Sequence, residues 1–204
     1  MQELKDRIVK EGKVLPGNII KVDGFLNHRI DTELMDHIAE EFGRHFNMDD
    51  VTLILTAEAS GIALSAIVAR HFRKPMVFAK KAKGDNLEGG LYQSEIFSYT
   101  YRRKVTLLVA KDWITPQDRV LIVDDFMARG EAMHGLIDLV TQAGAELVGI
   151  GVAVEKGFQH GGDRLRQAGY PLKSLAIIDG ADENGFLLRE ESGIADQKYL
   201  ARKI

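Results

Sequence analysis

Residues 120–132 read VLIVDDFMARGEA, and this stretch decides the fold class. Its first four residues are a continuous apolar run of the kind that forms a strand buried on both faces of a sheet. Asp124 and Asp125 follow, and Gly130 then opens an apolar-periodic stretch that predicts a helix to Ala143. In open α/β sheets, ligands bind at the carboxyl ends of the strands, and a helix N-terminus there attracts anions. The stretch therefore predicts a strand, a phosphate-binding loop and a helix, with two carboxylates beside the loop.

The same alternation of strands and helices extends on both sides of this stretch. Short β-branched runs bounded by turn residues predict buried strands, and apolar residues every three or four positions predict helices. We expect strands at 51–56, 76–79, 119–123, 147–154 and 174–178, and helices at 3–11, 31–46, 62–72, 130–143 and 163–168. Such a succession builds parallel strands with right-handed crossovers. The expected fold class is α/β, with a mostly parallel central sheet flanked by helices.

All 204 residues read as one domain with three parts. Residues 1–46 are expected to form an N-terminal hood of helices over one end of the sheet. Residues 47–180 form the core, and residues 181–204 form a C-terminal tail beside the hood. Within the core, residues 80–93 are polar and rich in glycine and lysine, which is typical of a mobile functional loop. Two further strands are expected as a hairpin, at 94–101 and 104–110.

The composition excludes several function classes. The 27 basic and 30 acidic residues give a net charge of -3, whereas a chain held to nucleic acid or anionic membrane by overall charge is basic. No stretch reaches the roughly 18 apolar residues that a membrane helix needs, and the N-terminal residues lack the apolar core of a signal peptide. The absence of cysteine excludes disulfides, thiolate metal sites and a cysteine nucleophile. We therefore expect a cytoplasmic protein.

Two adjacent carboxylates beside a phosphate seat suit a phosphorylated sugar. Carboxylate oxygens accept hydrogen bonds from sugar hydroxyls, and they also suit a hydrated Mg²⁺ ion. A ribose 5-phosphate group would occupy both the acids and the loop. The alternative is purely structural: a capped helix after a strand, with Asp125 as a solvated turn residue.

Residues 120–132 resemble the motif that binds 5-phosphoribosyl 1-pyrophosphate (PRPP) in the type I phosphoribosyltransferases. That motif has four apolar residues, two acids, two apolar residues and a small loop that leads into a helix. Beyond the motif, nearly the whole chain is similar to the bacterial xanthine phosphoribosyltransferases, a branch of this family. The blocks that carry this second resemblance are Lys21–Val22–Asp23, Phe25–Leu26–Asn27–His28, Glu58 with Ser60–Gly61, and Val154–Glu155–Lys156–Gly157–Phe158–Gln159.

The resemblance implies the type I phosphoribosyltransferase fold, a homodimer and an enzyme of purine salvage. Its reaction would transfer the 5-phosphoribosyl group from PRPP to xanthine, giving xanthosine 5′-phosphate (XMP) and pyrophosphate. Mg²⁺ would enter with PRPP, and no protein-held metal is expected. Two alternatives remain: transfer to guanine or hypoxanthine, or less readily adenine, and a PRPP-sensing transcriptional regulator on the same fold. A regulator would carry an added DNA-binding domain, and the first 45 residues contain no helix-turn-helix pair.

The resemblance also assigns roles to site residues. Asp124 and Asp125 would be the catalytic acids that hold the ribose hydroxyls, directly or through water and Mg²⁺. The 5-phosphate loop would be Ala128, Arg129, Gly130, Glu131 and Ala132; the pyrophosphate loop Glu58, Ala59, Ser60 and Gly61; and the purine contacts Ile20, Asn27 and Lys156. Many such loops have Thr or Gly where this chain has Arg129, Glu131 and Ala132, so backbone N–H groups are expected to carry phosphate binding.

Side-chain chemistry suits a purine at the other end of the site. Lys156 can donate to a purine carbonyl oxygen but not to the 6-amino group of adenine, and Asn27 can both donate and accept. Phe158 could stack on the ring. The structural alternatives are a solvated strand-end lysine for Lys156 and a turn residue for Asn27. No general base is assigned, because xanthine ionises near neutral pH; Glu155 is only a neighbouring candidate.

The lysines at the start of the expected loop have two interpretations. Lys80, Lys81 and Lys83 could close over the leaving pyrophosphate, neutralising its charge and excluding water. The alternative is an ordinary surface loop, and the sequence does not separate the two.

Overall fold

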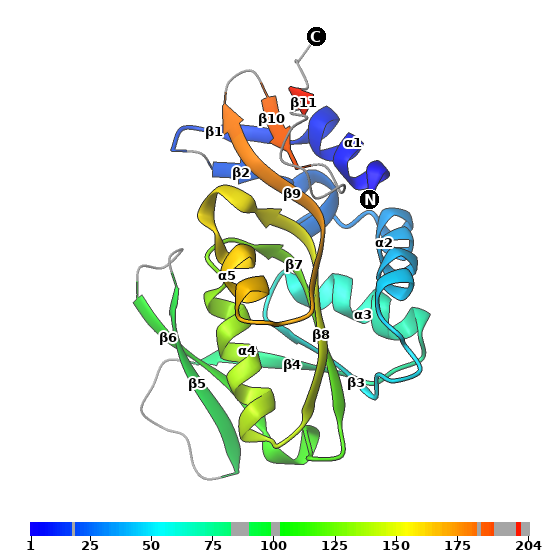
Figure 1. Cartoon of the computed structure of the whole chain (residues 1–204), viewed down its shortest axis with the longest axis vertical. Coiled ribbons are helices and arrows are strands. Elements are labelled where there is room, and N and C mark those ends of the chain that lie inside the picture. Colours follow the sequence, from blue (N-terminus) through cyan, green and yellow to red (C-terminus); the bar gives the residue numbers. More distant parts are fainter. Residues whose placement is uncertain (18, 83–89, 99–102, 183–184, 190–198, 201–204) are drawn as a thin grey trace.

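A nine-stranded sheet forms the centre of the molecule, in the order β11-β10-β9-β8-β7-β3-β4-β6-β5. The computed structural model describes residues 1–17, 19–82, 90–98, 103–182, 185–189 and 199–200 (Figure 1). The central strands β9, β8, β7, β3 and β4 run parallel to one another. Their bounds are Leu53–Ala57 for β3, Met76–Ala82 for β4, Arg119–Met127 for β7, Glu146–Lys156 for β8 and Leu172–Asp182 for β9.

Antiparallel strands extend the sheet at both edges. On one side, β5 (Leu91–Ser98) and β6 (Arg103–Ala110) form the expected hairpin, and β6 pairs with β4. On the other side, β10 (Gly185–Leu188) turns back on β9, and β11 (Tyr199–Leu200) pairs with β10. The α/β fold class is confirmed, with a parallel centre between antiparallel edges.

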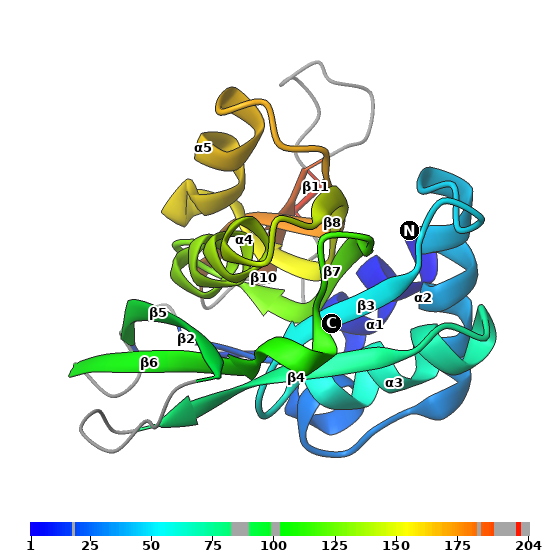
Figure 2. The same ribbon diagram turned by 90° about the horizontal axis from the view of Figure 1, so that it is seen from below.

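Helices cover both faces of the sheet (Figure 2). On one face, α2 (Thr32–His45) and α3 (Gly61–His71) bury their apolar stripes against β7, β8 and β9. On the other face, α4 (Glu131–Gln142) and α5 (Gly161–Gln167) pack on the same central strands. Because both faces are covered, the central strands are apolar throughout, and β3 is buried along its whole length.

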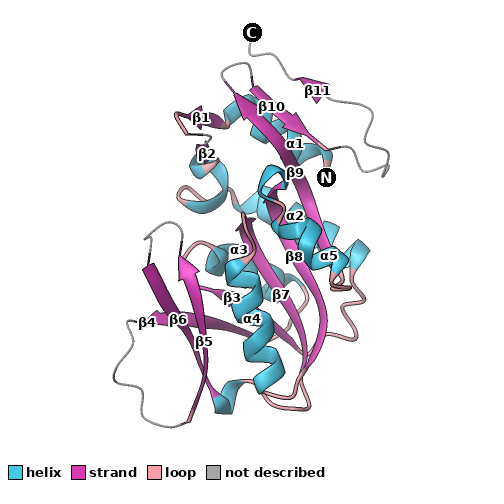
Figure 3. Cartoon of the chain, turned by 60° about the vertical axis from the view of Figure 1, so that its left-hand side comes forward, coloured by secondary structure: helices cyan, strands magenta, loops and turns pink. Residues whose placement is uncertain are grey.

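A smaller group of elements forms the hood beside β9 and β10. It contains α1 (Gln2–Glu11), the two-stranded ribbon β1 (Lys13–Leu15) and β2 (Ile19–Lys21), and the short helical turn η1 (Asp23–Asn27). Figures 1 and 3 show these elements together near β10, away from the β5–β6 hairpin. The remaining short turns are η2 (Lys111–Trp113) and η3 (Gly157–Gln159).

Helix α2 lies with the core layer, whereas residues 1–46 were all expected in the hood. The expected N-cap is present, since Asp31 Oδ1 accepts from the Leu34 N–H at 3.2 Å. The apolar stripe then places two aromatic rings over glycines of β8. Phe42 lies over Gly151 and Phe46 over Gly149, and the missing side chains leave room for the rings. Aromatic rings that fill such close-packed gaps fix α2 on the sheet.

Several strands run further than their local sequence predicts, among them β4, β7 and β9, and β5 begins at Leu91, so residues 91–93 are strand rather than loop. Strand β4 continues to Ala82 because Lys80, Lys81 and Ala82 pair with Leu108, Leu107 and Thr106 of β6, so residues 80–82 are not loop. Strand β7 continues through the two acids to Met127, beside β8. The extensions of β4 and β7 depend on a partner strand that is distant in sequence. Of the expected loop, residues 83–89, with Lys83, lie outside the described residues, and so do residues 190–198 and 201–204 of the expected tail.

In the part of the chain that the structure describes, no helix has the length and apolarity required to span a membrane.

Candidate functional site

A cavity of about 380 Å³ lies where the carboxyl ends of β3, β4, β7 and β8 meet the hood and the start of α4. It is lined by Ile20, Asn27, Ala57, Glu58, Ser60, Lys81, Ile96, Phe97, Asp124, Asp125, Phe126, Met127, Ala128, Arg129, Gly130, Glu131, Ala132, Met133 and Lys156. Most residues expected in the site from the sequence are therefore brought together. The exceptions among them are Ala59, Gly61, Lys80 and Phe158, which do not line this cavity.

The two acids of β7 lie deep in the cavity wall. Asp124 is 7% exposed and Asp125 is 1% exposed, so the alternative of a solvated turn residue for Asp125 is wrong. Ser60 Oγ donates to Asp125 Oδ1 at 2.8 Å, and the Asp125 N–H donates to Asp124 Oδ1 at 3.0 Å. The other carboxylate oxygen, Asp125 Oδ2, is buried and has no partner among the described residues. Buried carboxylate oxygens need a partner, so the arrangement suits a ligand that offers hydroxyls or a cation.

The electrostatics of the pair point the same way. Burial, followed by the neighbouring charge of Asp125, raises the pKa of Asp124 well above the ordinary 3.8, while the Lys81 ammonium opposes the shift. A protonated Asp124 can donate a hydrogen bond, whereas an ionised pair attracts a cation. Both forms are complementary to a hydrated metal ion or to ribose hydroxyls.

The loop after β7 lines the cavity and leads into helix α4. Gly130 adopts φ +83°, a left-handed conformation that other residues rarely adopt, and it directly precedes α4. The first N–H groups of a helix have no acceptor within the helix, and the helix dipole adds a partial positive charge there. The backbone of residues 128–132 is therefore suited to bind an anion, whatever the side chains of Arg129, Glu131 and Ala132.

The turn from β3 to α3 forms the wall opposite this loop. Glu58 holds the end of β4, since Glu58 Oε1 accepts from the Lys81 N–H at 2.6 Å and the Glu58 N–H donates to the Ala79 carbonyl at 3.0 Å. A Cβ atom at Gly61 would overlap Asp124 Oδ1, so glycine lets α3 begin against the acid. Successive side chains of a strand point to opposite faces, and Lys81 lines the cavity while Lys80 does not.

The side chains expected from the sequence at the other end of the cavity come from three separate segments. Ile20 comes from β2, Asn27 from η1, and Lys156 from the end of β8. The Lys156 Nζ atom lies 5.2 Å from the ring centroid of Phe126, and burial lowers the pKa of this lysine. A partly buried ammonium above an aromatic face is a donor site with few competing water molecules. This end suits a flat heterocycle that carries carbonyl oxygens.

Two residues suggested by the sequence lie elsewhere. Phe158 lies in η3 and lines a different cavity of about 320 Å³, together with residues of β9 and β10. Glu155 is fully buried on the α5 side of the sheet, where Arg166 donates to both of its carboxylate oxygens and Ser174 Oγ donates to Oε2. Glu155 is therefore not placed to accept a proton from a ligand in the cavity.

Phe126 is the aromatic residue that the sequence interpretation missed. It lines the cavity beside Lys156, where it could take the stacking role that the sequence interpretation gave to Phe158. The available signal was its place next to the two acids, at the point where β7 enters the site. Ala57, Ile96, Phe97, Met127 and Met133 also line the cavity without having been expected.

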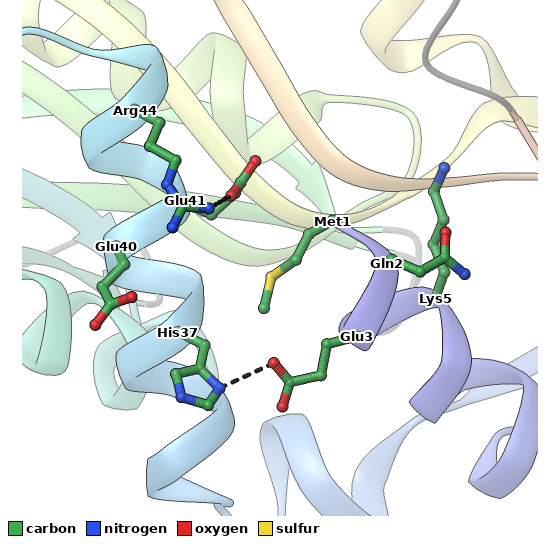
Figure 4. Close-up of a pocket in the computed structure, with 8 residues that line it drawn as sticks. All are labelled: Met1, Gln2, Glu3, Lys5, His37, Glu40, Glu41 and Arg44. Carbon is green, nitrogen blue, oxygen red and sulfur yellow. Dashed lines mark hydrogen bonds and ion pairs between the residues drawn. The ribbon is translucent and has the colours of Figure 1, made fainter.

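A larger cavity, of about 520 Å³, lies between α1 and α2 and is a weaker candidate. Figure 4 marks two pairs among its side chains: His37 Nδ1 lies 2.9 Å from Glu3 Oε2, and Arg44 Nη1 lies 2.7 Å from Glu41 Oε2. Exposed pairs of this kind satisfy each other and contribute little. The smaller cavity is the stronger candidate, because it contains the unpartnered buried oxygen of Asp125 and the N-terminus of α4 with its Gly130 cap.

The fold and the site together are those of a phosphoribosyl transferase. Residues 25–178 match the phosphoribosyl transferase domain family, which spans the strands and the loop that build the cavity, and the chain belongs to this family.

Relatives with curated names narrow the class further. The chain is 50% identical over 187 residues to a protein of Bifidobacterium adolescentis named xanthine phosphoribosyltransferase, covering 91% of this chain and 97% of that one. It is 52% identical over 179 residues to a protein of the same name from Lachnoclostridium phytofermentans, covering 88% and 92%. Among solved structures, the adenine phosphoribosyltransferase of Giardia lamblia, complexed with 9-deazaadenine, aligns with a TM-score of 0.72, at 25% identity, over 85% of this chain and 96% of that one.

Proposed function

We propose that this protein transfers the 5-phosphoribosyl group from PRPP to xanthine, giving XMP and pyrophosphate, as an enzyme of purine salvage. The observation that carries the proposal is the cavity with two unlike ends. Backbone N–H groups and buried carboxylates stand at one end, and the Lys156 ammonium above Phe126 stands at the other. The names of the relatives at about half identity support xanthine as the base.

In the proposed reaction, a ring nitrogen of the purine forms a bond to C1 of the ribose. The C1–oxygen bond to pyrophosphate breaks, and the electron pair leaves with the pyrophosphate. One imidazole-ring N–H proton of the purine passes to solvent in this step, and because xanthine ionises near neutral pH, no strong protein base is required. The protein then contributes positioning, stabilisation of charge and exclusion of water.

Each wall of the cavity has a part in this scheme. The 128–132 backbone binds the 5-phosphate, and Asp124 and Asp125 hold the ribose hydroxyls. These contacts place C1 between the purine and the turn at Glu58–Gly61. Lys81, which lines the same wall, lies where it can offset the negative charge of the departing pyrophosphate.

Mg²⁺ is proposed to enter with PRPP and to be held largely by it. The unpartnered Asp125 Oδ2 atom fits a hydrated Mg²⁺ ion, which prefers oxygen ligands and keeps several of its waters. Among the residues that the structure describes, no three His, Asp or Glu side chains gather as a metal site. When bound, the ion would neutralise negative charge on the pyrophosphate.

Purine choice is proposed to rest on Lys156, Asn27 and Phe126. Lys156 would donate to a purine carbonyl oxygen, and Phe126 would contact the ring face. Adenine offers an amino donor at the corresponding carbon, which leaves the buried ammonium without an acceptor. Guanine and hypoxanthine share one carbonyl oxygen with xanthine, and they remain the alternative substrates.

The test is nucleotide formation from Mg-PRPP with xanthine, guanine, hypoxanthine and adenine in parallel reactions. XMP as the dominant product is the expected result. A different dominant nucleotide would leave the reaction class standing and overturn the assignment of the base. Binding of PRPP without formation of any nucleotide would favour the PRPP-sensing regulator, to which the names of the relatives lend no support.

A homodimer in the cytoplasm is the proposed state of the protein. Phe78, Phe97 and Trp113 are 38%, 40% and 65% exposed, and such aromatic side chains are enriched at subunit interfaces. The absence of cysteine is compatible with a reducing compartment. Light scattering of the purified protein should give twice the chain mass of 22.7 kDa, and a monomer mass at assay concentration would contradict the dimer.

A further inference from the structure

Helix α5 lies against the outside of the phosphate loop. A Cβ atom at Gly161, the first residue of α5, would overlap the Ala128 carbonyl oxygen and would lie 2.8 Å from the Gly130 nitrogen. Only glycine therefore allows the helix backbone and the loop backbone to touch. Helix and loop form one packed unit, although about 30 residues of sequence separate them.

Arg164 of α5 fixes one peptide group of this loop. Its Nη2 atom donates to the Arg129 carbonyl oxygen at 2.9 Å. Because a trans peptide is planar, the direction of this carbonyl also sets the direction of the following N–H, that of Gly130, on the opposite side. A contact outside the cavity thus controls where a backbone donor of the loop points.

Helix α5 is itself held by a buried charge cluster. Glu155 accepts from both terminal nitrogens of Arg166, at 3.2 and 2.7 Å, and from Ser174 Oγ. A Cβ atom at Gly162 would overlap the Glu155 carboxylate, so the helix backbone lies directly on it. Bidentate pairs of this kind fix orientation as well as distance.

A second set of ion pairs ties α5 to the hood side of the sheet. Arg189, after β10, donates to Asp179 through two nitrogens and to Asp163 of α5 at 3.1 Å. These pairs raise the pKa of Arg189, so the charge persists at any working pH. The helix is therefore anchored to β8, β9 and the segment after β10.

We propose that α5 is a positioning element for the phosphate loop, and that Arg164 and Gly161 aim the loop's N–H groups at the 5-phosphate. The proposal rests on the proposed function of the cavity. Neither residue lines the cavity, so neither is expected to touch substrate. Backbone donors bind an anion well only when their directions are set beforehand, and small errors in placement cost affinity.

The first test compares Arg164→Ala with wild type in KM for PRPP, KM for xanthine, kcat, and affinity for ribose 5-phosphate. We expect KM for PRPP and the dissociation constant for ribose 5-phosphate to rise about fivefold, which is the effect of losing one hydrogen bond. The kcat and the KM for xanthine should stay within about twofold of the wild-type values. Arg164→Lys should recover part of the loss, because lysine can still donate. Arg70→Ala on α3, where the arginine side chain is 80% exposed, is the charge-matched control and should match wild type.

Salt separates positioning from simple attraction. At about 1 M salt, exposed charges are screened beyond about 3 Å. The ratio of the ribose 5-phosphate dissociation constants of Arg164→Ala and wild type is compared at low and high salt. A ratio that persists at high salt supports positioning, and a ratio that falls to one overturns it.

Gly161→Ala provides a test with no change of charge. Its methyl group must displace the Ala128–Gly130 backbone, so the ribose 5-phosphate affinity should fall at least as far as in Arg164→Ala. Thermal unfolding shows whether the variant is folded; if it is not, the Arg164 series decides.

Normal ribose 5-phosphate affinity in both folded variants would overturn the proposal. A wild-type protein that binds ribose 5-phosphate but forms no nucleotide would overturn the proposed function alone, and the affinities would still decide the role of α5.

Discussion

The two ends of the cavity are built in different ways. The proposed phosphate end comes from one continuous stretch, in which β7, the 128–132 loop and α4 follow directly, and its proposed donors are backbone N–H groups. The purine end combines β2, η1, β7 and β8, and its contacts are side chains. An anion seat made of backbone tolerates side-chain variation, whereas a pocket of side chains changes its ligand with each substitution. In the proposed function, the phosphate end would preserve the reaction and the purine end would select the base.

The largest effect should come from the acid at the phosphate end. We expect Asp125→Asn to lower kcat/KM for PRPP by about 100-fold, because a buried carboxylate that meets the developing charge is lost, while its shape is kept. Steady-state kinetics with varied PRPP, and thermal unfolding to show an intact fold, provide the measurement. Asp138→Asn, on the exposed side of α4, is the matched control and should behave as wild type. Unchanged PRPP kinetics in Asp125→Asn would remove this residue from the site.

A substitution at the purine end should affect the kinetics with xanthine rather than those with PRPP. Lys156→Ala should raise KM for xanthine about tenfold or more, the cost of losing a partly buried charged donor, with KM for PRPP changed by less than about threefold. Lys10→Ala, on the exposed side of α1, is the control. An equal rise for both substrates would mean that the two ends are not separate, and that Lys156 does not read the base.

A pair of phenylalanine variants compares the residue expected from sequence with the one found in the cavity. Phe126→Leu should raise KM for xanthine about fivefold, since an aromatic contact contributes about 1 kcal/mol beyond its area. Phe158→Leu should leave KM unchanged, because Phe158 lines another cavity. The reverse result would restore Phe158 as the stacking residue.

The smallest expected effect concerns stability. Asp124 has a raised pKa, so between pH 3.8 and the raised value the folded state binds more protons than the unfolded state. The free energy of unfolding of wild type therefore falls as pH rises through this window. Asp124→Asn removes the penalty, and it should raise the free energy of unfolding at neutral pH, with the gain vanishing at low pH. Chemical denaturation across pH measures this, and a gain that is constant with pH would show that the buried charge of Asp124 is not its cause.

Local patterns predicted the parts of the molecule that are built locally. The apolar run at 120–123, the acids after it, the Asp31 cap and the strand–helix alternation all follow from neighbours in the chain. The part of strand β4 beyond Ala79 could not be predicted in this way, because its last residues pair with β6. Likewise the orientation of Phe158, the burial of Glu155 against Arg166, and the packing of α2 on β8 depend on contacts between distant segments.

The last two residues of β8 have a consequence for how such a protein can change over generations. Side chains alternate along a strand, so Glu155 lies with Arg166 on one side and Lys156 lines the cavity on the other. Loss or gain of one residue within β8 would exchange their sides, turning the carboxylate toward the cavity and the ammonium toward the α5 side of the sheet. Such a frame-preserving change would damage recognition and folding together. A point substitution at Lys156 can therefore alter the cavity without touching Glu155, whereas a change in strand length would alter both.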